Sequence, residues 1–407
     1  MQDKISINYK YKLKPNKTQK SALWSTLQSC RHQYNEGLEL WNECWECTKI
    51  GINAFDLNEY FKSTHKNIHS QVKQNVNNRI ATAFKNFFDK RTKYPKFKSR
   101  NQYRSFTYPQ SGFKLVDDKY VKLSGIGKVN ITLHRPIVGK IKTCTLKVSK
   151  TKQWYVIFSV EVAPDNFFET PASKNKDAVG LDIGIKTFAS LSDGTQIENP
   201  RFLYKSLKKL KRAQRRLSRK KKGSQNRKKQ IHKVAKLHER VANQRKDFHF
   251  QTAHWLVNKY NLIAVENLSP QFMIKNHKLA QHATDVGMSQ FFDILTHEAF
   301  KHKTFVGPIN PHNTSQLCAN CKKIVSKELS VRTHVCPYCG FVCDRDVNAA
   351  INIVDRIPDE FKQSHSLLRN GIAGTAKTQT PVETSTAVND SKELVTSTVA
   401  EAGSHVL

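Results

Sequence analysis

Hydrophobic and polar residues follow strand-like and helix-like patterns along the first part of the chain. Residues 5–13 alternate with a period of two, which predicts a half-buried strand. Asn16 is a candidate cap for a following helix, and residues 71–89 place apolar side chains at helical spacing. Further strands are predicted at 122–133, with a turn signal at Ser124-Gly125, at 144–148 and at 154–162. Residues 1–165 are therefore expected to form a mixed β and helical region without a catalytic constellation.

The second part of the chain has a different order of elements, after a Pro-, Asn- and Lys-containing linker at 165–176. The predicted elements are a strand, tight turn and strand at 178–192, two helices within 204–258 broken at Gly223-Ser224, a strand at 262–265 and a helix at 288–303. A last helix begins near Asp346 and ends around Ile357-Pro358. Residues 370–407 have no periodicity and are expected to be disordered.

The charge of the chain changes this picture most. Lys and Arg number 68 against 33 Asp and Glu, which gives a formal net charge of +35 over 407 residues. Such an excess repels itself unless a polyanion neutralises it, and nucleic acid is the natural partner. A membrane surface is the alternative, but we find no convincing basic amphipathic helix and no apolar run of ~20 residues. The start of the chain lacks a signal-peptide core, so we expect a soluble cytoplasmic protein without a membrane partner.

Four of the nine cysteines form two tight pairs. Cys318 and Cys321 are separated by two residues, as are Cys336 and Cys339, and this spacing lets two turns present four thiolates to one ion. We predict one structural Zn²⁺ with no free ligand position; buried free cysteines are the alternative. The isolated pair Cys44-Trp-Glu-Cys47 has the same form but is expected to serve packing.

Three acidic residues stand in contexts unlike those of surface acids. Asp182 lies within an apolar strand, Glu266 at the end of another, and Asp346 at the start of a helix. A buried carboxylate is costly unless a positive charge pairs with it, and two Mg²⁺ ions would supply that charge and clamp a phosphodiester. Asp346 could instead be only a helix cap, Glu266 could pair with a nearby cation, and Asp344 competes with Asp346 as the third ligand.

Two segments are candidates for nucleic-acid contact. Residues 205–233 hold fifteen Lys or Arg and no acid, so the cations have no intrahelical partners. A second segment, 96–108, interleaves aromatic and basic residues; its aromatic side chains could stack bases or fill a core. The aromatic residues concerned are Phe97, Tyr103, Phe106 and Tyr108. The cations selected are Lys96, Lys98, Arg100, Lys208, Lys211, Arg212, Arg215, Arg216 and Arg219.

The motifs carrying these acids resemble those of a known family. The segments Gly180-Leu-Asp182-Ile-Gly184, Val265-Glu266-Asn267 and Asp344-Arg-Asp346-Val-Asn348 look like the three RuvC motifs of the transposon-encoded TnpB (OrfB) proteins, which are relatives of type V CRISPR effectors. Thr314-Ser-Gln before Cys318 is similar to the sequence that precedes the zinc ribbon of that family. The resemblance runs from the first strand to about residue 357.

The resemblance implies an α/β fold with an RNase H-like (RuvC) core. An N-terminal β-barrel with a helical insert would occupy 1–165 and help to recognise guide RNA and a short DNA motif. The core would occupy 177–303, including the basic hairpin at 204–258, and would be completed by 344–357 after a zinc ribbon at 304–343. Asp182, Glu266 and Asp346 match the catalytic acids of the family, and Arg332 is a candidate for contacting the scissile phosphate. Lys322 departs from the Gly that many relatives have after the first cysteine pair.

The function implied is that of an RNA-guided DNA endonuclease of a prokaryotic transposable element, acting at the nucleoid. Its expected partners are a guide RNA from the transposon end and double-stranded DNA with a short adjacent motif, and a monomer with RNA is favoured. RNase H-like folds host several chemistries. A transposase or recombinase that acts without RNA, and a binding-only regulator of transposition, therefore remain alternatives.

Overall fold

The structure is a computed structural model that describes residues 5–164, 176–267, 275–276, 279–328 and 331–358. It divides into two compact units, Met1–Phe167 and Phe168–Leu407, which are described separately. The predicted disordered tail at 370–407 lies outside the described residues, as does all but the last residue of the predicted linker at 165–176. No helix in the described part of the chain is both long and apolar enough to cross a bilayer.

The first unit is built on a seven-stranded antiparallel sheet that curves into a barrel-like form. Along the sheet the order is β2-β6-β7-β1-β5-β4-β3. The alternating burial of the strands places one face inside, where Tyr11, Val156 and Phe158 are fully buried. The turn at Ser124-Gly125 separates β4 from β5. The strands are β1 (Ile5–Lys14), β2 (Ser105–Tyr108), β3 (Phe113–Val116), β4 (Tyr120–Leu123), β5 (Gly127–Thr132), β6 (Lys140–Val148) and β7 (Trp154–Val162).

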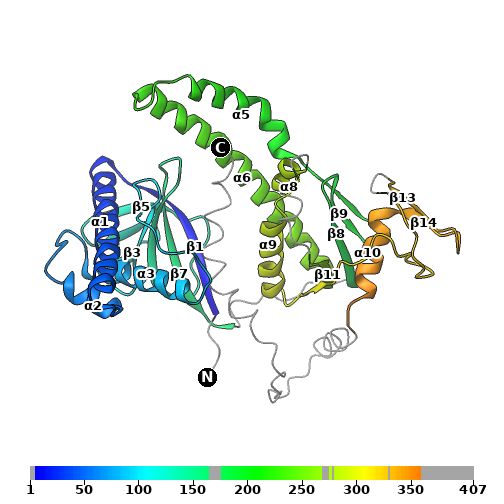
Figure 1. Cartoon of the computed structure of the whole chain (residues 1–407), viewed down its shortest axis with the longest axis horizontal. Helices are drawn as coiled ribbons and strands as arrows, with labels where there is room; N and C mark the ends of the chain where they lie inside the picture. The colour runs from blue at the N-terminus through cyan, green and yellow to red at the C-terminus, as the bar shows by residue number, and fades with distance from the viewer. Residues whose placement is uncertain (1–4, 165–175, 268–274, 277–278, 329–330, 359–407) are drawn as a thin grey trace, which may run out of the picture. The chain divides into compact units, whose positions relative to one another are not determined.

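Three helices lie beside this sheet in Figure 1: α1 and α3 contact β2, and α2 packs on α3. They are α1 (Lys17–Thr48), α2 (Ala54–Tyr60) and α3 (Ser70–Phe88). Asn16 begins α1 through a capping box with Gln19, which satisfies backbone N–H groups that the helix leaves unpaired. Trp41 of α1 stacks on Phe84 of α3 with ring centroids 4.1 Å apart. The first unit therefore has its own core.

The aromatic residues of the segment at 96–108 have divided roles. Tyr103, Phe106 and Tyr108 are buried, with at most 6% of each residue exposed. The expectation that these three could stack nucleic-acid bases is therefore wrong: their rings fill the core of the first unit, because β2 carries Phe106 and Tyr108 into the sheet. Phe97 differs, since 54% of it is exposed, and stacking by Phe97 stays a prediction.

The second unit contains a five-stranded sheet of order β10-β9-β8-β11-β12. β8 pairs antiparallel with β9 and β9 with β10, whereas β8–β11 and β11–β12 are parallel. Three consecutive antiparallel strands followed by two parallel ones, with the first strand in the centre, form the predicted RNase H-like core. The strands are β8 (Lys176–Ile183), β9 (Thr187–Leu191), β10 (Gln196–Glu198), β11 (Tyr260–Glu266) and β12 (Phe305–Ile309).

Helices cover both faces of this sheet (Figure 1). Ile263 and Val265 of β11 pack with helices α6 and α9, whereas the alternate residues Leu262 and Ala264 pack with Ile353 of α10. A strand buried on both faces explains the continuous apolar run that predicted β11. The helices are α5 (Phe202–Ser218), α6 (Gln225–Lys259), α8 (Ala280–Val286), α9 (Met288–Lys301) and α10 (Arg345–Asp355); β13 (Thr333–Val335) and β14 (Val342–Asp344) form a small separate sheet.

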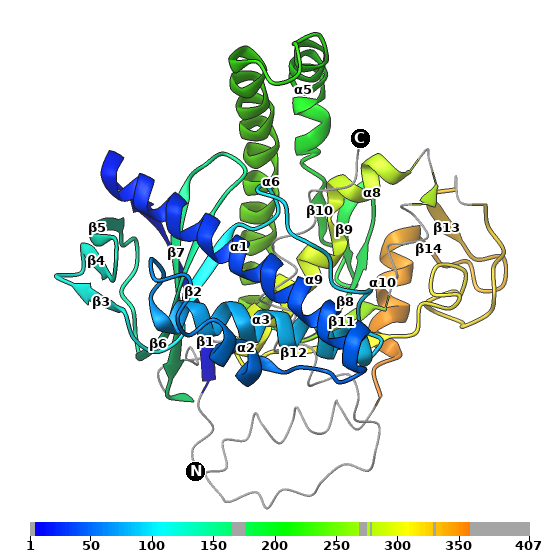
Figure 2. The ribbon, with the colours of Figure 1, turned by 60° about the vertical axis from the view of Figure 1, so that its left-hand side comes forward.

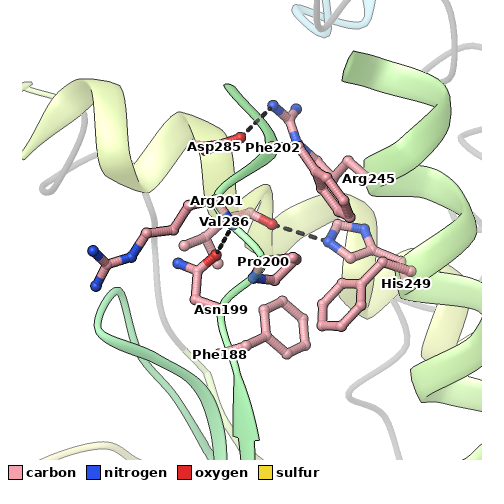
Figure 3. A pocket seen from close by; sticks show the side chains of 10 residues that line it. Phe188, Asn199, Pro200, Arg201, Phe202, Arg245, His249, Asp285 and Val286 are labelled. Atoms are coloured by element: carbon pink, nitrogen blue, oxygen red, sulfur yellow. Dashed lines mark hydrogen bonds and ion pairs between the residues drawn. The ribbon is translucent and has the colours of Figure 1, made fainter. Parts of the chain in front are cut away.

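The basic hairpin consists of α5 and α6, which run side by side in Figure 2. The N-cap residue of α5, Arg201, makes no side-chain hydrogen bond to the helix. The N–H of Leu203 instead donates to both carboxylate oxygens of Asp285 at 3.1 Å. Arg245 of α6 pairs with the same carboxylate at 3.3 Å (Figure 3). An anion at a helix N-terminus is stabilising, so Asp285 anchors the base of the hairpin.

A small cavity at this junction does not qualify as a ligand site. It is lined by residues that include Phe188, Asn199 and His249, as Figure 3 shows. The cavity encloses about 10 Å³, which is roughly the space of one water molecule. Among its lining residues, Asp285 and Arg245 make the ion pair at the base of the hairpin.

Candidate active site and metal centre

The period of the strands brings the three predicted acids to one face of the second sheet. Ala264 pairs in register with Gly180 and Val265 with Leu181, so the next residues in each parallel strand, Asp182 and Glu266, are neighbours. Leu262 and Ala264 face α10, and period-two alternation places Glu266 on that same face. Asp346 lies in the first turn of α10.

A glycine allows α10 to approach this face closely. A Cβ built on Gly180 would lie only 1.9 Å from the carbonyl oxygen of Ala350 and 2.9 Å from the backbone nitrogen of Val354. Backbone atoms cannot move aside as a flexible side chain can, so any other residue here would push α10 away from β8. Close packing at Gly180 thereby holds Asp346 near Asp182.

The three carboxylates interact electrostatically. Burial, together with the negative charges of Glu266 and Asp346 and against the opposing effect of Arg345, raises the pKa of Asp182 to about 8. A cluster of carboxyl groups in a desolvated setting resists full ionisation. A divalent cation would remove this penalty, so the set has the electrostatic character of a metal site.

Glu266 is held by partners on the segment after β12. It is 9% exposed, and its pKa is raised by burial and lowered by a hydrogen bond from Thr314 and by the positive charge of Arg356. The Thr314 hydroxyl donates to Oε1 of Glu266, which orients the carboxylate. Sequence reasoning noted Thr314 only as part of a family motif and missed this contact.

The structure gives Asp344 and Asp346 different roles. Oδ1 of Asp344 accepts hydrogen bonds from the N–H groups of Asp346 at 2.8 Å and Val347 at 3.3 Å, so Asp344 is the N-cap of α10. The carboxylate of Asp346 instead accepts from Arg345 at 3.0 Å and from Arg332 at 3.4 Å. Arg345, whose role the sequence did not reveal, lies between the two acids in the chain and binds the carboxylate of Asp346.

The spacing of the acids is wider than that of a compact single-ion site. Among the described residues, two groups of three or more metal-ligating side chains bring their ligand atoms within 4.8 Å of one another, and the acids do not form either. The groups are Cys318 with Cys321, Cys336 and Cys339, and His254 with Glu298 and His302. Two Mg²⁺ ions ~3.5–4 Å apart need a broader cradle, and hard carboxylate oxygens suit Mg²⁺. The chemistry of the donor set therefore fits Mg²⁺.

The four cysteines predicted as zinc ligands lie together. Their Sγ atoms fall within 4.8 Å of one another; Sγ of Cys321 lies 3.5 Å from that of Cys336, and Sγ of Cys318 lies 3.8 Å from that of Cys339. With Zn–S bonds of ~2.3 Å, a tetrahedral ion separates its sulfurs by about 3.8 Å. These thiols fit a structural Zn²⁺. Cys47 of the isolated pair is exposed on α1 and Cys44 only partly buried.

Side chains of α10 join the cysteine cluster to the candidate active site. Asn348 accepts a hydrogen bond from the N–H of Ala319 at 2.9 Å and donates to the carbonyl of Leu317 at 2.7 Å. Asn352 is buried and donates to the carbonyl of Thr314 at 2.9 Å. Lys322, at the position where the sequence departs from the family pattern, has a left-handed φ of 58°. The first cysteine turn therefore keeps the conformation that glycine favours.

The predicted nucleic-acid contacts occupy exposed positions with few exceptions. The six cations selected on α5 and in the loop after it are exposed. In the first unit Lys96 and Arg100 are exposed, whereas Lys98 is half-buried and lies 6.0 Å from the ring centroid of Tyr34. Arg332 is exposed but paired with Asp346. Apart from Lys98, which lies against Tyr34, and Arg332, which pairs with Asp346, the selected cations are exposed and available to a phosphate backbone.

Family models match three parts of the chain. A model described as a probable transposase (OrfB_IS605) matches residues 157–277, a Cas12f1-like TNB domain matches residues 289–353, and a helix-turn-helix domain matches residues 1–49. In the structure the last range holds strand β1 followed by one long helix, α1. The second range contains all four clustered cysteines and Asp346.

Full-length relatives and a solved structure are also similar to the chain. A "Putative RNA-guided DNA endonuclease" of Streptomyces pristinaespiralis is 33% identical over 367 residues, covering 87% of this chain and 90% of the relative. "Putative RNA-guided DNA endonuclease InsQ" of Escherichia coli (strain K12) is 31% identical over 371 residues, covering 85% and 91%. The Cas12f1 chain of a Cas12f1–sgRNA–target DNA complex superposes with a TM-score of 0.54 at 15% identity, covering 82% of each chain, which shows a shared fold.

Proposed function

Because the chain belongs to the OrfB (TnpB) family of transposon-associated RNA-guided DNA endonucleases, we propose that it cuts DNA whose sequence is selected by a bound RNA. Pairing between RNA and DNA would read the sequence, while the protein recognises shape and a short duplex motif beside the target. The net charge of +35 and the exposed cations of α5 support nucleic acid, a polyanion, as the partner.

We assign the hydrolytic step to Asp182, Glu266 and Asp346. The observation that carries this assignment is the convergence of three acids from distant segments at one face of an RNase H-like sheet, where Asp182 and Glu266 follow paired positions of β8 and β11 and the charges of Glu266 and Asp346 act on Asp182. When bound, two Mg²⁺ ions would neutralise the carboxylates, activate a water and stabilise the charge that develops on the phosphate. Asp182 and Glu266 would hold the ions from the sheet, and Asp346 would hold them from α10.

The neighbouring side chains keep these acids in position for that chemistry. Thr314 orients one oxygen of Glu266, which leaves the other for a ligand. Arg345 and Arg332 neutralise Asp346. Their guanidinium groups could transfer from this carboxylate to a DNA phosphate, since Arg binds both anions in the same bidentate manner.

The ribbon and the first unit would complete the enzyme. One structural Zn²⁺ in the four-cysteine site would make the segment between β12 and α10 more rigid. It would thereby help to fix the distance between Glu266 and Asp346. The barrel-like first unit, with exposed Phe97, Lys96 and Arg100, would contact the RNA and the adjacent DNA motif. We propose that one chain acts with one RNA.

Sequencing the RNA that copurifies with the full chain, expressed with its flanking DNA, tests this function. We expect RNA with a defined end. Replacing the segment beyond that end should redirect Mg²⁺-dependent cleavage to a plasmid that matches the new sequence, while a scrambled plasmid stays intact. The variant Asp182→Ala should bind the same RNA without cutting. Strand joining without RNA would favour a transposase, and cleavage retained in Asp182→Ala would place the active site elsewhere.

A further inference from the structure

A second cluster of metal-ligating side chains lies apart from the acids and the cysteines. It comprises His254 near the end of α6, with Glu298 and His302 at the end of α9. Oε2 of Glu298 lies 3.7 Å from Nδ1 of His254 and 3.9 Å from Nε2 of His302. One carboxylate oxygen therefore stands between two imidazole rings.

The spacing of these residues explains why they meet. Glu298 and His302 are four residues apart, at the last turn of α9 and its C-cap, so both lie on the same face of the helix. Helices α6 and α9 pack along each other, and this brings His254 against the pair. The two imidazole rings are in contact, with centroids 5.2 Å apart and planes inclined by 71°.

The donor atoms have the composition and spacing of a transition-metal site. Two imidazole nitrogens are borderline donors, and together with one carboxylate oxygen they form a set that suits Zn²⁺, Co²⁺ or Ni²⁺ rather than Mg²⁺. Bonds of ~2.0–2.2 Å to a tetrahedral ion separate neighbouring ligand atoms by about 3.4 Å. The measured 3.7 Å and 3.9 Å exceed this by amounts that small side-chain rotations remove. We propose that His254, Glu298 and His302 bind one divalent transition-metal ion of the Zn²⁺ class.

The burial of the cluster leaves one side open to solvent. The side chains of Glu298 and His302 are 12% and 3% exposed, whereas that of His254 is 56% exposed. An ion held by these three would thus have a path for entry and room for a water molecule as fourth ligand. Nε2 of His254 lies 3.0 Å from the amide nitrogen of Asn258. With Nδ1 on the metal, Nε2 would carry the proton, so the Asn258 amide would have to turn its oxygen toward the ring to accept that hydrogen bond and fix the histidine.

The position in the fold indicates a structural role for this ion. Helix α6 leads into β11 and α9 leads toward β12, so the ion would join the two helices at the starts of two paired strands. Glu266 lies at the opposite end of β11, six residues from Tyr260, which corresponds to about 20 Å. The site is therefore too far from the proposed catalytic acids to share their ions.

Metal content of the full-length protein tests the proposal. Protein saturated with Zn²⁺ and then exchanged into Mg²⁺-containing buffer should hold one ion fewer per chain in His254→Ala than in the wild type. Glu298→Gln should show the same loss. His282→Ala is the matched control, because His282 is an exposed histidine of helix α8 outside the cluster and its removal should change nothing.

Co²⁺ replacement distinguishes this site from the ribbon. Thiolate-to-metal charge-transfer bands should persist in His254→Ala, since the four cysteines are intact, while the weaker bands of nitrogen and oxygen coordination disappear. Because His254 is largely exposed, the variant should fold, which thermal melting in metal-free buffer checks. Equal metal content and equal spectra in the wild type and His254→Ala would overturn the proposal.

Discussion

At the scale of single residues, the two acids at the start of α10 show what sequence can and cannot decide. Asp344 and Asp346 were both candidates for the third metal ligand. Either aspartate could instead serve as the cap of the helix, because Asp is a good N-cap residue. Only coordinates separate the two roles. The cap bonds of Asp344 engage its carboxylate with backbone N–H groups, whereas the carboxylate of Asp346 contacts Arg345 and Arg332. The charges of both acids raise the pKa of Asp182.

A buried histidine near the base of the hairpin predicts a pH effect on stability. Burial lowers the pKa of His249 to about 4, even though its ring contacts the carbonyl of Val286. In the unfolded chain the group titrates near 6.5, so the unfolded state binds one more proton between these values. Stability should therefore fall as pH drops from about 6.5 to about 4, by up to about 1.4 kcal/mol per pH unit from this group.

Urea denaturation of wild type and His249→Gln across this pH range measures that contribution. The variant loses packing and should be less stable at neutral pH by about 1–2 kcal/mol. Its free energy of unfolding should nevertheless decline less steeply below pH 6.5, because a glutamine does not titrate. His282→Gln, at an exposed position, should keep the slope of the wild type. Parallel slopes for the wild type and His249→Gln would contradict the prediction.

At the scale of elements, hydrophobic periodicity predicted most of the second sheet and its helices. The apolar runs around Asp182 and before Glu266 indicated strands, and a two-residue period is enough to place both acids on one face once the strands are parallel neighbours. The elements that the sequence did not predict include α2, β2, β10, α8 and β12. These elements are short, and β12 includes Gly307 and Pro308, which weaken any strand signal.

The close approach of α10 to β8 depends on Gly180. The substitution Gly180→Ala would place a methyl group within 1.9 Å of the carbonyl oxygen of Ala350. We expect a loss of about 3 kcal/mol in the free energy of unfolding, since the backbone must shift to relieve the overlap. DNA cleavage should fall as well, because the shift moves Asp346 away from Asp182.

Gly51→Ala is the control for this substitution. A Cβ on Gly51 meets nothing within 4 Å, so its effect on urea denaturation should stay within about 0.5 kcal/mol. If Gly180→Ala matched Gly51→Ala in both stability and cleavage, close packing of α10 on β8 would not position the acids.

At the scale of the whole molecule, residue spacing and charge predicted the zinc site and the cationic surface from the sequence, whereas side-chain contacts between distant segments could not be predicted. The two cysteine pairs and the run of cations could be recognised because each lies within a short stretch of sequence. Thr314 and the cluster at His254 could not, since their partners lie 48 and 44 residues away. Such contacts arise only when helices and strands pack, and no local pattern records them.

The proposed DNA cleavage depends most on three acids acting together around divalent ions. The direct measurement is the Mg²⁺-dependent rate at which the RNA-loaded protein cuts a matching plasmid, with RNA content measured in each variant. Asp182→Asn, Glu266→Gln and Asp346→Asn should each slow cleavage by about a hundredfold or more with RNA binding unchanged. Asp344→Asn, which keeps a good helix cap, should stay within about threefold of the wild type. Full activity in Asp346→Asn, or loss of activity only in Asp344→Asn, would contradict the assignment.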